Sequence, residues 1–282
     1  MAKKSILQFQ EMKRAGTKFV SLGVYEYAMA RFAEQAGIDL IEIGDSLGIG
    51  VYGYDGTLPV TVDQSIAHCA AVRRGAANTF IVADMPFMSY RTPEEAVINA
   101  GRFYREAGVD AVTMEGGRNI TDAVRAVVKA GMLVIGNIGL PETDVVQVPP
   151  GRYKDQCRTA VGAKDLIEDI RALVEAGICM VTLGPAPKEV AEFITKDIPV
   201  PTLGIGAGSF CDGQILLASD VIGMTDVILP CFSKRYADVD AIATEAIKRY
   251  VADVRGGVFP TKEFSDNMLP GEAEKMFKEY VR

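Results

Sequence analysis

The fold of this chain is decided by the stretch Ile41-Glu42-Ile43-Gly44-Asp45-Ser46-Leu47-Gly48. Its β-branched run ends in a carboxylate, a hydroxyl and two glycines, which is how a buried parallel strand presents polar side chains at the mouth of a pocket. Two further hydrophobic runs end in the same way, Phe80-Ile81-Val82-Ala83 at Asp84 and Ala111-Val112-Thr113-Met114 at Glu115. Three acids, each at the end of its own strand, predict one shared site.

Bulk composition narrows the class of protein. The chain has 282 residues, of which 49% are hydrophobic and 24% are charged, as is typical of a globular protein. Its formal net charge of −7 argues against nucleic acid as a partner, because nucleic-acid-binding surfaces are usually basic. The sequence has no apolar run of roughly 18 residues, and its polar N-terminus lacks the apolar core of a signal peptide. We therefore expect a cytoplasmic protein without a membrane partner.

Cysteine and histidine usage excludes several kinds of site. The five cysteines are scattered, odd in number and never spaced as Cys-x-x-Cys, so they predict reduced thiols and neither a disulfide framework nor a zinc site. His68 is the single histidine, which excludes any mechanism that needs two imidazoles. Its position within an expected helix is typical of a partly buried structural histidine.

A repeated phrase sets the architecture. The segments 34–44, 105–115 and 174–184 each end a helix, turn on a glycine and enter a β-branched strand. The expected strands are residues 19–23, 40–44, 79–83, 110–114, 132–137, 179–183, 200–204 and 226–229. The expected helices lie near 62–73, 93–106, 119–129, 163–176, 187–195 and 237–255. Eight strands that alternate with helices predict an α/β fold, a (β/α)₈ TIM barrel.

An open doubly wound sheet is the alternative fold. Such a sheet usually carries a glycine-rich fingerprint after its first strand, and none follows residues 19–23. The barrel prediction assigns residues 1–260 to a catalytic barrel. Residues 261–282 would form a C-terminal tail with a short helix.

Side chains alternate along a strand, so counting in twos predicts which of them face the barrel interior. If Asp45 points inward, Ile43 and Ile41 do so as well, and Glu42 faces the helix layer. The same count places further polar positions and one glycine inside: Asp84, Thr113, Glu115, Asn137, Thr182 and Gly184. The predicted floor of a pocket consists of Asp45, Ser46, Asp84, Thr113, Glu115 and Asn137. Oxygen ligands from several carboxylates suit a hard divalent ion, and we expect Mg²⁺.

Each of these groups has a simpler structural interpretation. Asp45 or Asp84 alone could cap a helix or form a turn after its strand. Ser46 is more typical of a cap than of a nucleophile, because no histidine is available as its base. The loop Leu203-Gly204-Ile205-Gly206-Ala207-Gly208 follows the seventh strand, where barrels often bind an anion on backbone N–H groups. Gly206 could bind substrate there, or the loop could be a tight turn that merely needs glycine.

At these residues the chain resembles the ketopantoate hydroxymethyltransferase (3-methyl-2-oxobutanoate hydroxymethyltransferase) family, part of the phosphoenolpyruvate mutase/isocitrate lyase superfamily. The resemblance covers roughly residues 5–260. The matching phrases are Gly44-Asp45-Ser46-Leu47-Gly48, Thr57-Leu58-Pro59-Val60-Thr61, Ala83-Asp84-Met85-Pro86-Phe87-Met88, Glu115-Gly116-Gly117 and Gly204-Ile205-Gly206-Ala207-Gly208.

The resemblance implies a barrel that forms homo-oligomers and acts in pantothenate biosynthesis. It implies magnesium held at Asp45 and Asp84 with Glu115 nearby, and a small 2-oxo acid that chelates the ion with help from Ser46. The metal then stabilises an enolate of the 2-oxo acid. That enolate attacks the one-carbon unit of 5,10-methylenetetrahydrofolate.

Three departures from the family pattern concern proton transfer. The family's lysine falls at Thr113, its histidine at Asn137 and its general base, a glutamate, at Gly184. We therefore take Glu115, Asn137 and Thr113 as the candidate catalytic positions. The expected activity is a metal-dependent, aldol-type transfer to a 2-oxo acid, of the hydroxymethyltransferase type.

Two alternatives remain open. A carbon–carbon lyase or decarboxylase of the same superfamily would form the same enolate without a base at that carbon, whereas proton abstraction needs a base that typically contributes 10² to 10⁴ in rate. A catalytically silent homologue, kept for binding or assembly, is the third interpretation.

Overall fold

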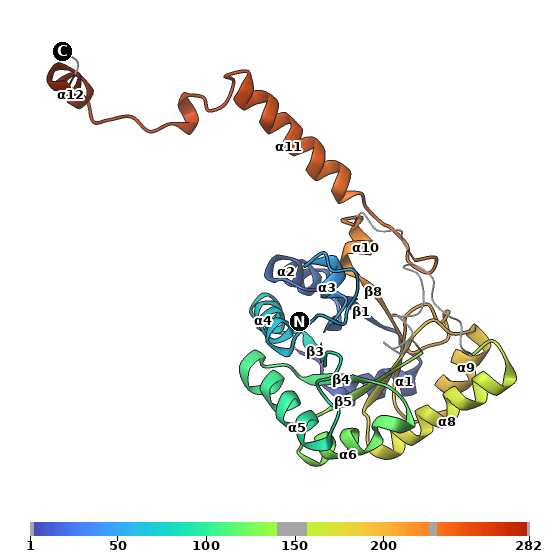
Figure 1. Ribbon diagram of the computed structural model, residues 1–282. Coiled ribbons are helices and arrows are strands. Elements are labelled where there is room, and N and C mark those ends of the chain that lie inside the picture. The colour runs from blue at the N-terminus through green and yellow to red at the C-terminus, as the bar shows by residue number, and fades with distance from the viewer. Residues whose placement is uncertain (1–2, 140–156, 226–229, 281–282) are drawn as a thin grey trace. The chain divides into compact units, whose positions relative to one another are not determined.

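The computed structural model describes residues 3–139, 157–225 and 230–280. Eight parallel strands close into a barrel in chain order, and helices surround it (Figure 1). The strands are β1 (Phe19–Gly23), β2 (Leu40–Ile43), β3 (Phe80–Asp84), β4 (Ala111–Glu115), β5 (Val134–Ile138), β6 (Met180–Leu183), β7 (Thr202–Gly204) and β8 (Gly213–Leu217). The predicted (β/α)₈ barrel is confirmed.

The eighth strand lies earlier than the sequence predicted. β8 closes the barrel by pairing with β7 on one side and with β1 on the other, where Phe19 is in register with Gly213. Residues 226–229, where this strand was expected, lie outside the described residues. Gly213 and Gln214 resemble a continuation of the preceding glycine-rich loop, so the local sequence does not indicate a strand there. Glycine is needed at 213, since an added Cβ would lie 2.4 Å from the Phe19 ring.

Helices follow most strands, as expected from the repeated phrase. In the barrel unit they are α1 (Ile6–Ala15), α2 (Tyr27–Ala36), α3 (Leu47–Gly50), α4 (Val62–Gly75), α5 (Pro93–Arg102), α6 (Thr121–Lys129), α8 (Ala160–Ala176), α9 (Lys188–Asp197) and α10 (Ala218–Ile222). Short segments join them, the π-helix η1 (Phe103–Ala107) and the 3₁₀-helix η2 (Arg118–Ile120). Threonine side chains accept backbone N–H bonds at the starts of α4, α5 and α8, which explains where these helices begin.

The core is divided into two apolar clusters. The inner cluster fills the barrel and contains Phe9, Phe19, Leu40, Phe80, Val82, Ala111, Ile135, Met180, Leu203 and Ile215. Phe9 comes from α1, and its ring centroid lies 5.1 Å from that of Phe19 and 5.4 Å from that of Phe80. The outer cluster packs the strands against the helices. Phe9 lies before β1 and Phe19 is the first residue of β1. Apolar packing therefore fills the amino-terminal end of the barrel.

The predicted facing of β2 is wrong. Leu40 belongs to the inner cluster, whereas Ile41 and Ile43 belong to the outer one. Glu42 therefore faces the barrel interior and not the helix layer. The physical reason is that β2 ends at Ile43, and the alternation does not continue through Gly44 to Asp45. Along β3 to β6, the predicted facing is right: the apolar residues on the predicted inward face belong to the inner cluster.

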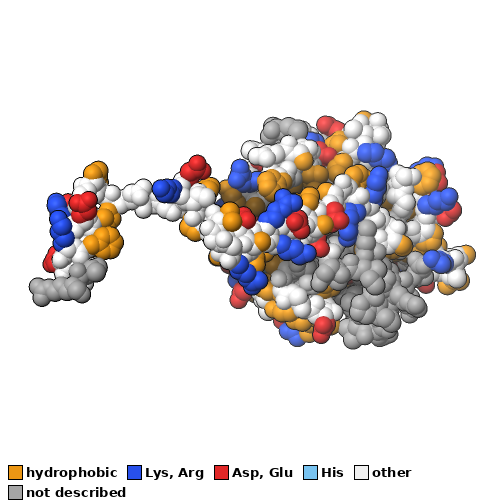
Figure 2. Space-filling model, turned by 90° about the horizontal axis from the view of Figure 1, so that it is seen from above, with side chains coloured by type: hydrophobic (Ala, Val, Ile, Leu, Met, Phe, Trp, Pro, Cys, Tyr) orange, Lys and Arg blue, Asp and Glu red, His pale blue; other side chains and the backbone are white. Residues whose placement is uncertain are grey.

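The chain divides into two compact units, Met1–Tyr236 and Ala237–Arg282. The second unit contains α11 (Val239–Arg255), the 3₁₀-helix η3 (Lys262–Phe264) and α12 (Glu272–Tyr280), none of which has a buried residue. Hydrophobic side chains lie exposed in this unit (Figure 2). The boundary expected at residue 260 falls within it. Among the described residues, no helix is both long and apolar enough to cross a membrane.

Candidate active site

Asp45 and Ser46 lie in the turn that follows β2. The Ser46 side chain does not cap α3; its hydroxyl instead hydrogen-bonds the Tyr25 hydroxyl at 2.7 Å. A Cβ added at Gly44 would lie 3.0 Å from Ser46 Oγ and 3.5 Å from Asp84 Oδ2, so the end of β3 packs against this turn. The structure thus brings together Asp45, Ser46 and Asp84 at the carboxyl ends of two adjacent strands.

Glu115 ends β4 and lies within electrostatic reach of Asp45. Burial raises the pKa of Glu115 well above its usual value, and the Asp45 charge raises it further. The pKa of the Tyr25 hydroxyl is raised first by burial, and Asp45 and Asp84 both add to that effect. The three predicted acids therefore lie close enough to shift the pKa values of one another or of the shared neighbour Tyr25. No cationic side chain is among the causes of the Glu115 shift.

This donor set fits a hard cation. Carboxylate and hydroxyl oxygens are the ligands that Mg²⁺ prefers, and repulsion between Asp45 and Glu115 is relieved when a positive charge binds between them. In the described ranges, no group of three or more His, Cys, Asp or Glu side chains is arranged to hold a metal ion. Magnesium usually needs only one or two protein carboxylates, with waters completing its shell. Asp45 and Asp84 could therefore hold it, and the three-acid assignment stays a prediction.

Glu42 is a site residue that counting along the strand missed. Its side chain is in the barrel interior, where Oε1 accepts a hydrogen bond from Thr113 Oγ1 at 3.2 Å. Burial raises the pKa of Glu42 to about 7, the Thr113 hydrogen bond opposes that rise, and the Asp45 charge adds to it. The signal available in the sequence was a charge within a β-branched run, which a buried strand rarely carries without a role.

His68 supports the site from α4. Its Nδ1 donates a hydrogen bond to the Tyr25 carbonyl, so Nε2 of the neutral ring can accept one from the Tyr52 hydroxyl at 3.0 Å. This arrangement fixes the backbone at Tyr25, whose hydroxyl contacts Ser46. The expectation of a structural histidine agrees with these contacts.

Three residues lie side by side near the carboxyl ends of β4, β5 and β6. Glu115 on β4 is in register with Asn137 on β5, and Asn137 is in register with Thr182 on β6. Gly184, where the resemblance places the family's base, directly follows β6 and brings no side chain. The candidate catalytic positions Thr113, Glu115 and Asn137 thus lie on adjacent strands of one barrel end.

Gly206 lies in the loop between β7 and β8. Its φ of +69° favours glycine, and an added Cβ would lie 2.7 Å from the Phe232 ring. Close packing therefore accounts for glycine at this position without any ligand. Binding of substrate or an anion at Gly206 stays a prediction.

A cavity of about 560 Å³ opens beside Glu115. Phe87, Met88 and Tyr90 from the segment after β3 line it, with Gly116 and Asn119 from the segment after β4. The Tyr90 hydroxyl donates to the Glu115 carbonyl at 3.2 Å. Met88 has a φ of +66°, which is uncommon for a residue with a side chain and often marks a ligand-binding segment. This cavity is large enough for an organic ligand.

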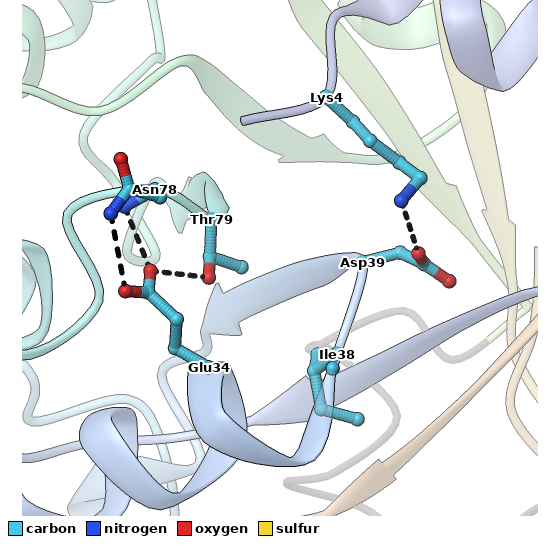
Figure 3. A pocket seen from close by; sticks show the side chains of 7 residues that line it. Lys4, Glu34, Ile38, Asp39, Asn78 and Thr79 are labelled. Atoms are coloured by element: carbon cyan, nitrogen blue, oxygen red, sulfur yellow. Dashed lines mark hydrogen bonds and ion pairs between the residues drawn. The ribbon is translucent and has the colours of Figure 1, made fainter. Parts of the chain in front are cut away.

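A smaller pocket, of about 20 Å³, lies where β2 and β3 begin (Figure 3). Lys4 forms an ion pair with Asp39 at 2.8 Å. Glu34 accepts hydrogen bonds from the Thr79 hydroxyl and the Asn78 backbone, which joins α2 to the start of β3. These polar groups bond one another, so this end of the barrel serves stability, as is usual for the fold.

Comparisons with known proteins agree with the geometry. The family model described as ketopantoate hydroxymethyltransferase matches residues 3–262. The chain is 43% identical to 3-methyl-2-oxobutanoate hydroxymethyltransferase of Carboxydothermus hydrogenoformans, covering 98% of this chain and 100% of the relative. It is 45% identical to the Dehalococcoides mccartyi protein of the same name, covering 91% and 92%.

Solved structures match the barrel at low identity. The crystal structure of 2,3-dimethylmalate lyase, a PEP mutase/isocitrate lyase superfamily member, matches with a TM-score of 0.59 at 18% identity, covering 97% of both chains. Phosphonopyruvate hydrolase in complex with oxalate and Mg²⁺ matches with a TM-score of 0.60 at 14% identity, covering 100% of both chains. At these identities, the structural matches establish the fold.

Proposed function

Because this chain belongs to the ketopantoate hydroxymethyltransferase family, we propose that it transfers a hydroxymethyl group to a small 2-oxo acid in a magnesium-dependent, aldol-type reaction. The observation that carries this proposal is the electrostatic interaction of Asp45, after β2, with Glu115 at the end of β4. Acids from separate strands act on one another there at the end of the barrel where such enzymes keep their chemistry.

The proposal gives each acid a role. Asp45 and Asp84 hold the magnesium ion, and Glu115 orients water or substrate beside it. Ser46, fixed by the Tyr25 hydroxyl, binds the substrate carboxylate. When bound, magnesium supplies Lewis-acid stabilisation of the negative charge that develops on the keto oxygen. A structurally similar phosphonopyruvate hydrolase was solved with oxalate and Mg²⁺, which is consistent with this assignment.

Proton abstraction beside the ketone needs a base, and Gly184 cannot supply it. We assign this role to Glu42, the carboxylate that faces the interior from β2 and accepts a hydrogen bond from Thr113. A pKa near 7 suits a general base, because the carboxylate is then available at neutral pH and still basic. Asn137 would position the substrate from β5.

The one-carbon donor in this proposal is 5,10-methylenetetrahydrofolate. The cavity beside Glu115 has room for an organic ring and offers the aromatic walls of Phe87 and Tyr90. A donor held there would lie next to Glu115.

A lyase or decarboxylase is the second candidate activity. The observation that favours it is the glycine at 184, because carbon–carbon cleavage needs no base at the carbon beside the ketone. The structural likeness to 2,3-dimethylmalate lyase is compatible with this alternative.

Product analysis separates the two activities. The protein is incubated with Mg²⁺, 3-methyl-2-oxobutanoate and 5,10-methylenetetrahydrofolate carrying ¹³C in its one-carbon unit. We expect ¹³C in a hydroxymethyl group of the product, and none when folate is omitted. Release of pyruvate or carbon dioxide from a panel of 2-oxo acids without folate would favour the lyase. A silent homologue would give neither product, and Mg²⁺ would not change its Tm.

We also propose that the protein is a cytoplasmic homo-oligomer. The helix α11 has no buried residue, and Ile247, Tyr250 and Val254 on it are 63%, 59% and 45% exposed. A second copy of the chain would cover these side chains, because isolated helices with an exposed apolar face gain most of their stability from packing.

A further inference from the structure

Thr182 carries a buried hydroxyl without a hydrogen-bond partner. The residue is 4% exposed, and its Oγ1 makes no hydrogen bond in the described part of the chain. Leaving a buried polar group unpaired is destabilising, and valine would have the same shape without that cost. A ligand that completes the bond would explain why a hydroxyl occupies this position.

The Thr182 side chain faces the barrel interior. Met180, two residues earlier on β6, belongs to the inner apolar cluster, and Val181 and Leu183 belong to the outer one. The next position on the same face is Gly184, which places no side chain over the hydroxyl. On the side of the barrel mouth, therefore, no side chain of β6 lies over the hydroxyl.

Asn137 gives the hydroxyl a polar neighbour. It is in register with Thr182 on one side and with Glu115 on the other. Its side chain faces inward, because Ile135 belongs to the inner cluster. Two strand spacings of about 4.8 Å separate β4 from β6, so Thr182 lies on the order of 10 Å from the strand that carries Glu115. Glu115, Asn137 and Thr182 thus lie on three adjacent strands, across the barrel interior from the turn that carries Asp45.

We propose that Thr182 and Asn137 form the specificity wall of the site and recognise an uncharged hydroxyl or carbonyl group on the substrate's side chain. This inference rests on the proposed function, in which the 2-oxo acid end of the substrate is anchored at Asp45 and Asp84. A hydroxyl and a carboxamide can each donate and accept, and neither carries charge. Among the 2-oxo acids that bind at Asp45 and Asp84, those with a neutral polar side-chain group would therefore bind more tightly than their alkyl counterparts, which leave Thr182 Oγ1 unpaired as it is in the ligand-free protein.

The test compares two probes that differ by one hydroxyl. Binding of 2-oxobutanoate and 4-hydroxy-2-oxobutanoate is measured by calorimetry with Mg²⁺ present, for the wild type, Thr182→Val and Thr182→Ser. We expect the wild type and Thr182→Ser to prefer the hydroxylated probe. Thr182→Val should lower that preference roughly 3- to 10-fold, the value of one hydrogen bond, while binding of 2-oxobutanoate changes little.

Ser21→Ala is the matched control. Ser21 Oγ is also buried and unpartnered among the described residues, but it lies on β1 in register with Leu40 and Ile215 of the inner apolar cluster. Its loss should leave the preference between the probes unchanged. If Thr182→Val keeps the wild-type preference, or Ser21→Ala loses it equally, the specificity wall is refuted.

A second measurement excludes a purely structural role. In ligand-free protein, Thr182→Val should raise the Tm by a few degrees, because it removes an unpaired buried hydroxyl. A lower Tm would mean that a buried water already satisfies the hydroxyl, which would overturn the inference. Wild-type protein that binds neither probe would refute the proposed function itself. Equal binding of both probes by all variants would refute only the specificity wall.

Discussion

Thr113 on β4 donates a hydrogen bond to Glu42 on β2, with 3.2 Å between Oγ1 and Oε1, inside the barrel. The strand β3 lies between these two strands, so the bond spans part of the interior and does not follow a neighbouring pair. The negative charge of Asp45 also raises the pKa of Glu42, the acceptor of this bond. The Glu42–Thr113 pair therefore couples the interior of the barrel to the acids at its mouth.

Stability of the metal-free protein should depend on the ionisation of Glu42. The folded-state pKa of Glu42, about 7, lies above the usual 4.5, so the folded protein holds this proton more tightly than the unfolded chain. The resulting stability is fully present below about pH 4.5 and is lost as the pH rises through 7. At 1.36 kcal/mol per pH unit, the contribution is at most about 3 kcal/mol.

Glu42→Gln tests this directly in protein treated with a chelator. We expect the variant to have a higher Tm than the wild type at pH 8, and this difference to shrink as the pH falls to 5. Thermal unfolding at several pH values provides the measurement. A difference that is independent of pH would contradict the assignment.

Thr113→Val should destabilise the protein through its effect on Glu42. Removing the donor leaves a buried carboxylate without its hydrogen bond, which costs about 1–3 kcal/mol. In a double-mutant cycle, Glu42→Leu combined with Thr113→Val should cost less than the sum of the single changes, because no polar group is left unpaired. Free energies of unfolding from urea titrations give the coupling, and strict additivity would show that the pair does not interact.

Magnesium should raise the Tm of the wild type, because a ligand that binds only the folded state stabilises it. At a concentration of 100 times the Kd, the stabilisation is about 2.7 kcal/mol. Asp45→Asn and Asp84→Asn should abolish most of this rise. Asp197→Asn is the control, since Asp197 ends α9 shortly before β7 begins, at the amino-terminal end of the barrel. An equal rise in all four proteins would mean that magnesium binds elsewhere.

The exposed face of α11 should carry an oligomer contact. Ile247, Tyr250 and Val254 recur at helical spacing, and all are exposed in a single chain. Ile247→Asp should reduce the oligomer mass measured by light scattering, because it places a charge in an apolar contact. Arg249→Asp, about 200° around the helix, should not. Loss of the oligomer in both variants, or in neither, would refute this contact.

The sequence predicted most of the barrel because its local signals agree with one another. The Ala36-Gly37-Ile38 phrase and its copies mark where helices end and strands begin, and seven of the eight expected strands overlap the observed ones. The eighth could not be recognised, because Gly213 serves close packing against Phe19 and resembles a loop glycine. That requirement exists only in three dimensions.

The site could be predicted only in part. Asp84, Glu115 and Asn137 are at strand ends, so alternation assigns their facing correctly. Glu42 was assigned to the wrong face because Gly44 interrupts the alternation before Asp45. The partners of Ser46 and Glu42, which are Tyr25 and Thr113, depend on tertiary packing that no local pattern encodes.

The central claim is that Asp45 and Asp84 hold a cation through which a 2-oxo acid binds. Calorimetric titration of 3-methyl-2-oxobutanoate into the wild type and Asp84→Asn, each with Mg²⁺ or with a chelator, tests it most directly. We expect binding by the wild type with Mg²⁺ and no detectable binding in the other three experiments. Binding that survives the chelator or the Asp84→Asn change would contradict it.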